Sequence, residues 1–135
     1  MHKFDRFKKI VGEDKVNYLG EKCVLVLGVG GVGGYVVEGL VRSGIGKIIV
    51  VDKDIVDETN INRQIIATDS SIGKKKVDVI ERRIKDINSL VEVIKIDKFI
   101  DKDNLNELFK YQFDYLVDAC DTVSTKLAVI DRCLK

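Results

Sequence analysis

Six of the eleven glycines of this 135-residue chain lie between Gly28 and Gly39, and four of them belong to the run Gly28-Val-Gly-Gly-Val-Gly33. A continuous apolar segment, 23–27, precedes the run and is typical of a strand buried on both faces. An apolar pattern with helical spacing begins after it, over 37–41. A strand, a G-x-G-x-x-G turn and a helix in this order indicate a phosphate-binding turn. The helix start offers free N–H groups, and glycines let a phosphate approach closely.

Strand-like and helix-like segments alternate along the chain. Strands are expected at 23–27, 47–52, 91–96 and 114–118. Besides the helix after the glycine turn, helices are expected at 60–67, 73–88, 103–111 and 122–134. This alternation predicts an α/β fold, Rossmann-like and doubly wound, with a mainly parallel sheet and helices on both faces. We expect an N-terminal helical segment, 1–21, and a nucleotide-binding domain, 22–135, which together form the N-terminal part of a longer protein.

Composition excludes several classes of protein. Apolar residues make up 45% of the chain and charged residues 33%, which argues against disorder and against a membrane protein. The formal net charge is only +1, whereas a protein that works mainly through the nucleic-acid backbone is usually far more basic. The three cysteines contain no C-x-x-C pair, so neither a zinc site nor a disulfide framework is indicated. We expect a soluble, cytoplasmic protein with no membrane partner.

Asp52 ends the second expected strand, where an acid accepts hydrogen bonds from ribose hydroxyls. The polar stretch after it contains Arg63 with the paired amides Asn60 and Asn62. A nicotinamide-dependent enzyme has no need for these groups, whereas an ATP site does, because the β- and γ-phosphates carry charge that the glycine turn leaves unbalanced. Thr59 or Asn62 is expected to cap the short helix at 60–67.

Several motifs in the same order resemble one family. They are the glycine run, Asp52-x-Asp54, Asn60-x-x-Arg-Gln64, Gly73-Lys-Lys-Lys76-Val and Asp118-Ala-Cys-Asp121. Together they are similar to the ThiF/MoeB/HesA family of ubiquitin-activating-enzyme-like adenylating enzymes. The resemblance runs from about Arg6 to the end of the chain.

The resemblance implies that a carboxylate attacks the α-phosphate of ATP, with Mg²⁺ as the metal. It assigns Arg63 to the triphosphate, Lys76 to the phosphates across the displacement, and Asp121 to Mg²⁺, and these three are the expected catalytic residues. The residue types fit, because Arg offers forked donors to phosphate, Lys a point charge and a carboxylate a ligand for a hard cation. The expected nucleotide-binding residues are Gly28, Gly30, Gly31, Gly33, Asp52, Asp54, Asn60, Arg63, Gln64, Lys76 and Thr122.

The resemblance leaves two kinds of substrate open. Four stretches resemble the members that adenylate threonylcarbamoyladenosine in tRNA and lead to its cyclic dehydrated form. They are Arg6-Phe, Arg42-Ser-Gly-Ile-Gly46, Asn62-Arg-Gln-Ile65 and Asp121-Thr-Val-Ser-Thr-Lys126. A tRNA would need a local basic face, to which Lys74–Lys76, Arg82, Arg83 and Lys85 could contribute. The alternative substrate is the C-terminus of a ubiquitin-like sulfur carrier protein of the ThiS/MoaD type.

Other expectations follow from the resemblance or compete with it. Relatives are usually homodimers, and they often carry an arginine near Gly12 that reaches a phosphate across the dimer. This sequence has Gly12-Glu-Asp at that place, so the resemblance does not extend to this contact. A NAD-dependent oxidoreductase and a catalytically silent nucleotide-binding fragment remain the further alternatives.

Overall fold

The computed structural model describes residues 2–135 and contains one four-stranded parallel sheet with the strand order β3-β2-β1-β4. The strands are β1 (Cys23–Leu27), β2 (Lys47–Val51), β3 (Glu92–Ile96) and β4 (Tyr115–Asp118). Their registers align Leu27 with Val51 and with Asp118, so the carboxyl ends of the strands meet at one edge. The predicted Rossmann-like parallel sheet is confirmed.

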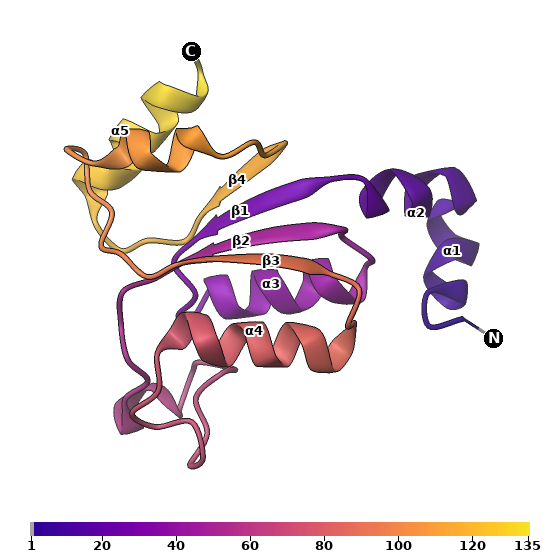
Figure 1. Cartoon of the computed structure of the whole chain (residues 1–135), viewed down its shortest axis with the longest axis horizontal. Coiled ribbons are helices and arrows are strands. Elements are labelled where there is room, and N and C mark those ends of the chain that lie inside the picture. Colours follow the sequence, from indigo (N-terminus) through magenta and orange to yellow (C-terminus); the bar gives the residue numbers. More distant parts are fainter. Residues whose placement is uncertain (1) are drawn as a thin grey trace.

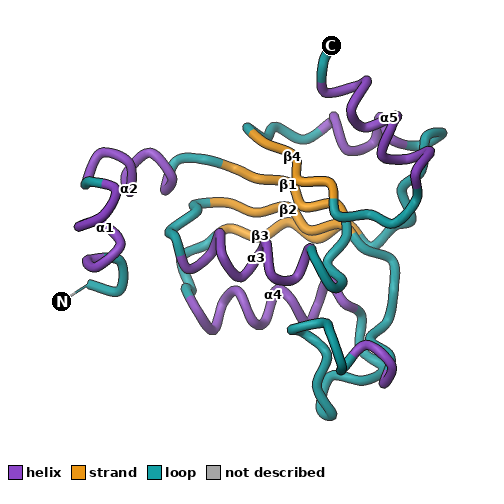
Figure 2. The backbone as a smooth tube through the Cα atoms, turned by 180° about the vertical axis from the view of Figure 1, so that it is seen from behind, coloured by secondary structure: helices purple, strands orange, loops and turns teal. Residues whose placement is uncertain are grey.

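Helices cover both faces of the sheet (Figure 1). On one face lie α3 (Gly33–Arg42) and α4 (Lys76–Ile87), and on the other lie the 3₁₀ helix η2 (Leu105–Lys110) and α5 (Val123–Cys133). Strand β1 alternates between the two cores, because Val24 and Val26 belong to the core under α3 and α4, whereas Leu25 and Leu27 belong to the other. Figure 2 shows the same layers from behind.

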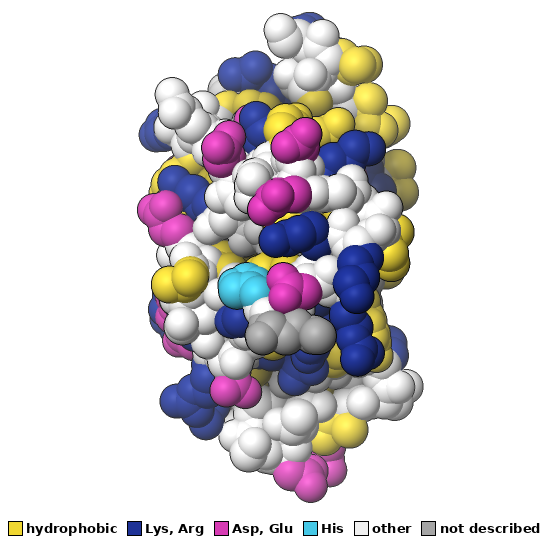
Figure 3. All heavy atoms as spheres, turned by 90° about the vertical axis from the view of Figure 1, so that its right-hand side faces the viewer, with side chains coloured by type: hydrophobic (Ala, Val, Ile, Leu, Met, Phe, Trp, Pro, Cys, Tyr) yellow, Lys and Arg dark blue, Asp and Glu magenta, His cyan; other side chains and the backbone are white. Residues whose placement is uncertain are grey.

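The first helices, α1 (Asp5–Val11) and α2 (Glu13–Gly20), stand at the end of the sheet where β1 begins (Figure 1). Neither helix contains a buried residue. Basic and acidic side chains are interspersed over this end of the molecule (Figure 3). None of the helices among residues 2–135 is long and apolar enough to cross a membrane. The division of the chain into domains at residue 21 stays a prediction.

The segment between β2 and α4 differs from the expectation. The helix expected at 60–67 is wrong, because the only helical turn here is the 3₁₀ helix η1 (Glu58–Asn60). Its cap is neither Thr59 nor Asn62: the Asp57 side chain accepts the backbone N–H of Thr59 at 2.8 Å. The Thr59 hydroxyl donates to the same carboxylate oxygen, and this bond above all, with that from the N–H, holds the pKa of Asp57 below its ordinary value.

Two further helices begin or wind differently from the prediction. The helix expected from residue 73 begins at Lys76, because Gly73 has a positive φ of 85° and Lys75 is extended, pairing with Ile55 in an isolated bridge. The helix expected at 103–111 is the shorter 3₁₀ helix η2.

Candidate functional site

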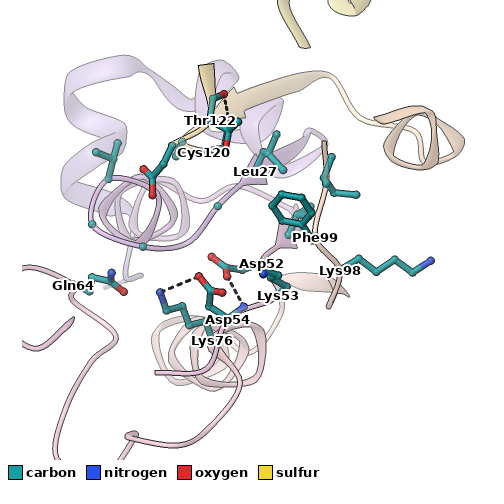
Figure 4. A pocket seen from close by; sticks show the side chains of 18 of the residues that line it. Leu27, Asp52, Lys53, Asp54, Gln64, Lys76, Lys98, Phe99, Cys120 and Thr122 are labelled. Atoms are coloured by element: carbon teal, nitrogen blue, oxygen red, sulfur yellow. Dashed lines mark hydrogen bonds and ion pairs between the residues drawn. The ribbon is translucent and has the colours of Figure 1, made fainter. Parts of the chain in front are cut away.

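A cavity of about 420 Å³ opens at the carboxyl ends of the strands. The glycine turn after β1 lines it together with the segments 51–54, 98–100 and 119–122, which follow β2, β3 and β4. Arg63, Gln64 and Lys76 complete the wall. Figure 4 shows Gln64 and Lys76 with other residues of the wall. This is the edge at which open parallel sheets bind ligands, since the loops after neighbouring strands converge there.

The glycines of the turn have two different tasks. Gly30 and Gly31 line the cavity, and a Cβ on either would meet only side-chain atoms, of Gln64 at 3.4 Å and of Arg63 at 3.9 Å. Gly33 does not line the cavity. It faces the turn itself, and a Cβ there would lie 1.7 Å from the carbonyl oxygen of Gly28. It therefore allows α3 to start directly against the turn, while Gly30 and Gly31 leave the approach open.

Asp52 ties the glycine turn to the end of β2. One oxygen of its carboxylate accepts the N–H of Val29 at 3.0 Å, and the other accepts the N–H of Asp54 at 2.8 Å. The carboxylate also lines the cavity, so its remaining acceptor capacity faces the space beside the turn. The predicted hydrogen bonds to ribose hydroxyls stay a prediction.

Lys76 is nearly buried, with a side chain only 7% exposed, and its one ion-pair partner within the described chain is Asp54 at 3.9 Å. The two side chains point toward one another in Figure 4. Gln64 is also buried, and its side-chain carbonyl oxygen has no hydrogen-bond partner among the described residues. A buried ammonium with one long contact and a buried unpaired amide oxygen are both costly unless a ligand completes them.

Arg63 is exposed at the rim of the cavity. Its guanidinium donates at 3.0 Å both to the carbonyl oxygen of Thr59 and to the side chain of Asn62, so it is folded onto its own loop. Asn60 lies outside the cavity, and its side chain accepts the N–H of Asp57 at 2.8 Å. Of the expected nucleotide-binding residues, only Gly33 and Asn60 are not part of the wall.

The segment after β4 brings Asp121 and Thr122 to the cavity. Asp121 is exposed and can share a cation with a ligand. Among residues 2–135, no group of three or more His, Cys, Asp or Glu side chains could hold a metal ion alone. Cys120 also lines the cavity, and burial, with a smaller effect of Asp118, raises the pKa of its thiol.

The wall residues that were not predicted from the sequence include Lys53, Lys98 and Phe99. The Lys53 ammonium lies 4.9 Å from the centre of the Phe99 ring, a cation–π contact. Lys53 directly follows the acid that ends the second expected strand, and Phe99 comes three residues after the third. The rule that ligands bind beyond the carboxyl ends of strands could have found both positions.

The six cations of the expected basic face do not form one continuous surface for a ligand, because several of them have different partners within the chain. Lys76 faces the cavity, whereas Lys75 pairs with Asp97 at 2.8 Å and Arg83 with Glu38 at 2.6 Å. Lys85 donates to the backbone carbonyl oxygens of Ser89 and Val91. Besides Lys76, which pairs with Asp54 in the cavity wall, three of the six cations are thus engaged by other groups of the chain.

A glycine turn between a parallel strand and a helix, an acid at the end of the next strand and a buried lysine beside both define a Rossmann-like nucleotide-binding protein. The chain belongs to the ThiF family, whose family model matches residues 4–135.

The proteins similar to this chain include two sequence relatives and one solved structure. The chain is 44% identical to a tRNA threonylcarbamoyladenosine dehydratase of Bacillus subtilis, over 100% of this chain and 53% of that protein. It is 30% identical to the SAMP-activating enzyme E1 of Haloferax volcanii, over 96% of this chain and 49% of that protein. The crystal structure of the E. coli tRNA N6-threonylcarbamoyladenosine dehydratase in complex with ATP matches with a TM-score of 0.94 at 36% identity, over 98% of this chain and 54% of that one. The chain spans about half the length of these relatives.

Proposed function

We propose that this chain supplies the ATP-binding part of an enzyme that adenylates a carboxylate. The observation that carries the proposal is the Lys76 side chain, which is 7% exposed and whose ammonium has Asp54, at 3.9 Å, as its one ion-pair partner among residues 2–135. An anion in the cavity would complete its neutralisation. The E. coli relative whose structure contains ATP supports a nucleoside triphosphate as that anion.

Several features of the cavity wall support a triphosphate as the ligand. The N–H groups at the start of α3 and the open approach over Gly30 and Gly31 favour phosphate oxygens. Lys76 provides a nearly buried positive charge inside the cavity, and Arg63 provides an exposed one at its rim. We assign to Asp52 the acceptance of hydrogen bonds from a ribose, in addition to its bond from the N–H of Val29 in the turn.

We assign Mg²⁺ to Asp121 together with phosphate oxygens. Among residues 2–135 no group of three or more His, Cys, Asp or Glu side chains could hold the cation alone, so Asp121 would share it with the phosphates, which is the usual arrangement for magnesium bound with a nucleotide. When bound, the cation would neutralise charge on the phosphates. Asp121 would hold it at the end of the cavity nearest α5.

The proposed reaction joins two anions. A carboxylate oxygen of the substrate forms a bond to the α-phosphorus, the bond from that phosphorus to the bridging oxygen breaks, and pyrophosphate leaves. Arg63 and Lys76 lower the barrier because they offset the charge that accumulates on the phosphates in the transition state. The buried position of Lys76 strengthens its effect, since less water screens it there.

We propose threonylcarbamoyladenosine in tRNA as the substrate, and its cyclic dehydrated form as the product. Support comes from the dehydratases of Bacillus subtilis at 44% identity and Haemophilus influenzae at 40% identity. The alternative is a ubiquitin-like sulfur carrier, supported by the 30% identity to an archaeal SAMP-activating enzyme. We further propose that the full protein is a cytoplasmic homodimer.

ATP–pyrophosphate exchange by the full-length protein tests the proposal, with modified tRNA and with a carrier protein in turn. Exchange that depends on modified tRNA is the expected result. Exchange that depends only on the carrier would replace the substrate but keep the chemistry. Absence of exchange with both, together with saturable NADH binding, would overturn the adenylation proposal.

A further inference from the structure

Asp118, the last residue of β4, makes two contacts that leave it little exposed. Its Oδ1 atom accepts the backbone N–H of Cys120 at 3.1 Å and lies 3.4 Å from the ammonium group of Lys126. The Asp118 side chain is 18% exposed and that of Lys126 is 39% exposed. Lys126 is in the first turn of α5, so the pair joins the end of β4 to the start of that helix.

The turn between these two residues, 119–122, is part of the cavity wall and carries Asp121. Two hydrogen bonds to the carbonyl oxygen of Thr122 hold this turn in place. The Cys120 thiol donates to it from within the turn at 3.9 Å, and the N–H of Lys126 donates to it from α5 at 3.0 Å. The Ala119 N–H donates to the carbonyl oxygen of Leu27 at 2.9 Å, which fastens the turn to the end of β1.

The turn also lies directly against the glycine turn. A Cβ on Gly28 would come within 2.8 Å of the Ala119 carbonyl oxygen, and one on Gly33 would lie 3.3 Å from the Ala119 methyl group. Because there is so little free space between the two turns, a displacement of the turn 119–122 would move Asp121 and would also disturb the glycine turn. Both are parts of the site to which we assign the phosphates and the metal.

We infer that Lys126 is a positioning residue for the nucleotide site, which acts through Asp118 to hold the turn 119–122 against the glycine turn. This inference rests on the proposed function, because it presupposes that ATP and Mg²⁺ bind at this cavity. Lys126 itself does not line the cavity. Without its ammonium, the carboxylate of Asp118 would be left partly buried with one backbone donor, and it would turn toward water and release the turn.

The test compares variants of the full-length protein by calorimetric titration with Mg²⁺–ATP. Lys126→Met removes the positive charge but keeps a side chain of similar length, and Lys126→Arg keeps the positive charge. Lys135→Met is the matched control, because Lys135 also forms an ion pair from α5, with Asp131 at 3.1 Å, but both side chains are about 70% exposed. A double variant, Asp118→Asn with Lys126→Met, measures whether the two residues act as one unit.

We expect Lys126→Met to weaken Mg²⁺–ATP binding about tenfold, by analogy with partners that orient metal-binding groups, and Lys126→Arg to restore most of the affinity. Lys135→Met is expected to bind as the wild type does, and the double variant no more weakly than Asp118→Asn alone. Melting temperatures should stay within about 5 °C of the wild type, which separates positioning from loss of fold.

Wild-type affinity in Lys126→Met would overturn the inference and leave the proposed function intact. Equal losses in Lys126→Met and Lys126→Arg, with unaltered melting, would also overturn it, because the restored charge would then have no effect. Failure of the wild type to bind Mg²⁺–ATP would overturn the proposed function and this inference with it.

Discussion

The ammonium group of Lys76 lies 3.9 Å from the carboxylate of Asp54, yet the two side chains differ sharply in exposure, at 7% and 57%. The cation is held in the wall of the cavity, whereas its partner is largely in water. A buried charge so weakly paired lowers the stability of the folded chain, and an anionic ligand would offset that cost. The weak pairing of Lys76 therefore connects the free energy of unfolding with the proposed affinity for ATP.

Lys76→Met should separate binding from stability. We expect affinity for ATP to fall about a hundredfold or more, as the charge inside the cavity is lost. The free energy of unfolding should be unchanged or higher by up to about 1 kcal/mol, because a poorly paired buried ammonium is removed. Titration with ATP and urea denaturation measure the two quantities.

The neighbouring Lys75→Met is the control for this prediction. Lys75 is exposed and pairs with Asp97 at 2.8 Å, and it does not line the cavity. Its replacement should leave both the free energy of unfolding and the affinity for ATP nearly unaltered, because an exposed ion pair contributes little. If Lys76→Met bound ATP as tightly as Lys75→Met, the role assigned to Lys76 would be wrong.

Gly33→Ala and Gly39→Ala place the same methyl group on the same helix with opposite expected results. At Gly33 the Cβ would lie 1.7 Å from the Gly28 carbonyl oxygen, so the glycine turn must move, and we expect destabilisation of about 3 kcal/mol or more. At Gly39 no atom lies within 4 Å, and alanine should stabilise α3 by about 0.5–1 kcal/mol. Thermal unfolding measures both; a similar melting temperature in the two variants would contradict the packing described at Gly33.

Much of the fold could be predicted from the sequence, and the reason is visible in β1 and β2. Both strands are buried on two faces, so their apolar runs mark them from end to end. The segment 52–75 could not be predicted in the same way. Its backbone is held by specific polar contacts, such as the Asn60 side chain accepting the N–H of Asp57, which periodicity does not encode.

The candidate site divides in a similar manner. The resemblance to the family predicted Arg63, Lys76 and Asp121 as site residues, and all three line the cavity, whereas their roles stay predictions. Lys98 and Phe99 belong to no motif of that resemblance, and they line the cavity because they follow β3, which lies beside β2 in the sheet. The separate task of Gly33 required the distance to Gly28, which depends on how closely α3 approaches the turn.

Glu38 should make stability depend on pH through its bonds between α3 and α4. Its carboxylate accepts from Arg83 at 2.6 and 3.0 Å and from Arg42 at 2.8 Å, and the bond from Arg83 above all lowers its pKa below 4.5. Because the folded pKa is the lower one, the stabilisation is fully present above the unfolded value and is lost as pH falls through the folded value.

Glu38→Gln should therefore cost about 1–2 kcal/mol near neutral pH, a figure reduced for the partial exposure of Arg83. The difference from the wild type should shrink below about pH 4.5. Urea denaturation over this range provides the measurement, with Glu92→Gln as the control, since Glu92 forms only an exposed pair with Lys47. A difference that stayed constant with pH would show that the charge of Glu38 contributes nothing.

Cys120 should report on occupation of the cavity. Its thiol lies in the wall, and burial raises its pKa, so little of the reactive thiolate is present at neutral pH. We expect iodoacetamide to modify Cys120 about tenfold more slowly than the exposed Cys133, and ATP to slow it further without affecting Cys133. Mass spectrometry of the labelled peptides distinguishes the sites. Labelling of Cys120 that is indifferent to ATP would place the nucleotide elsewhere.

The central claim is that a carboxylate oxygen of the substrate becomes bonded to the α-phosphorus of ATP. Full-length protein supplied with ATP, Mg²⁺ and a substrate whose carboxylate carries a heavy oxygen isotope tests this directly. When the activated carbon is later attacked, its bond to that oxygen breaks and the oxygen leaves with AMP. We predict AMP that contains one labelled oxygen. Unlabelled AMP, or formation of ADP and phosphate in its place, would contradict the account.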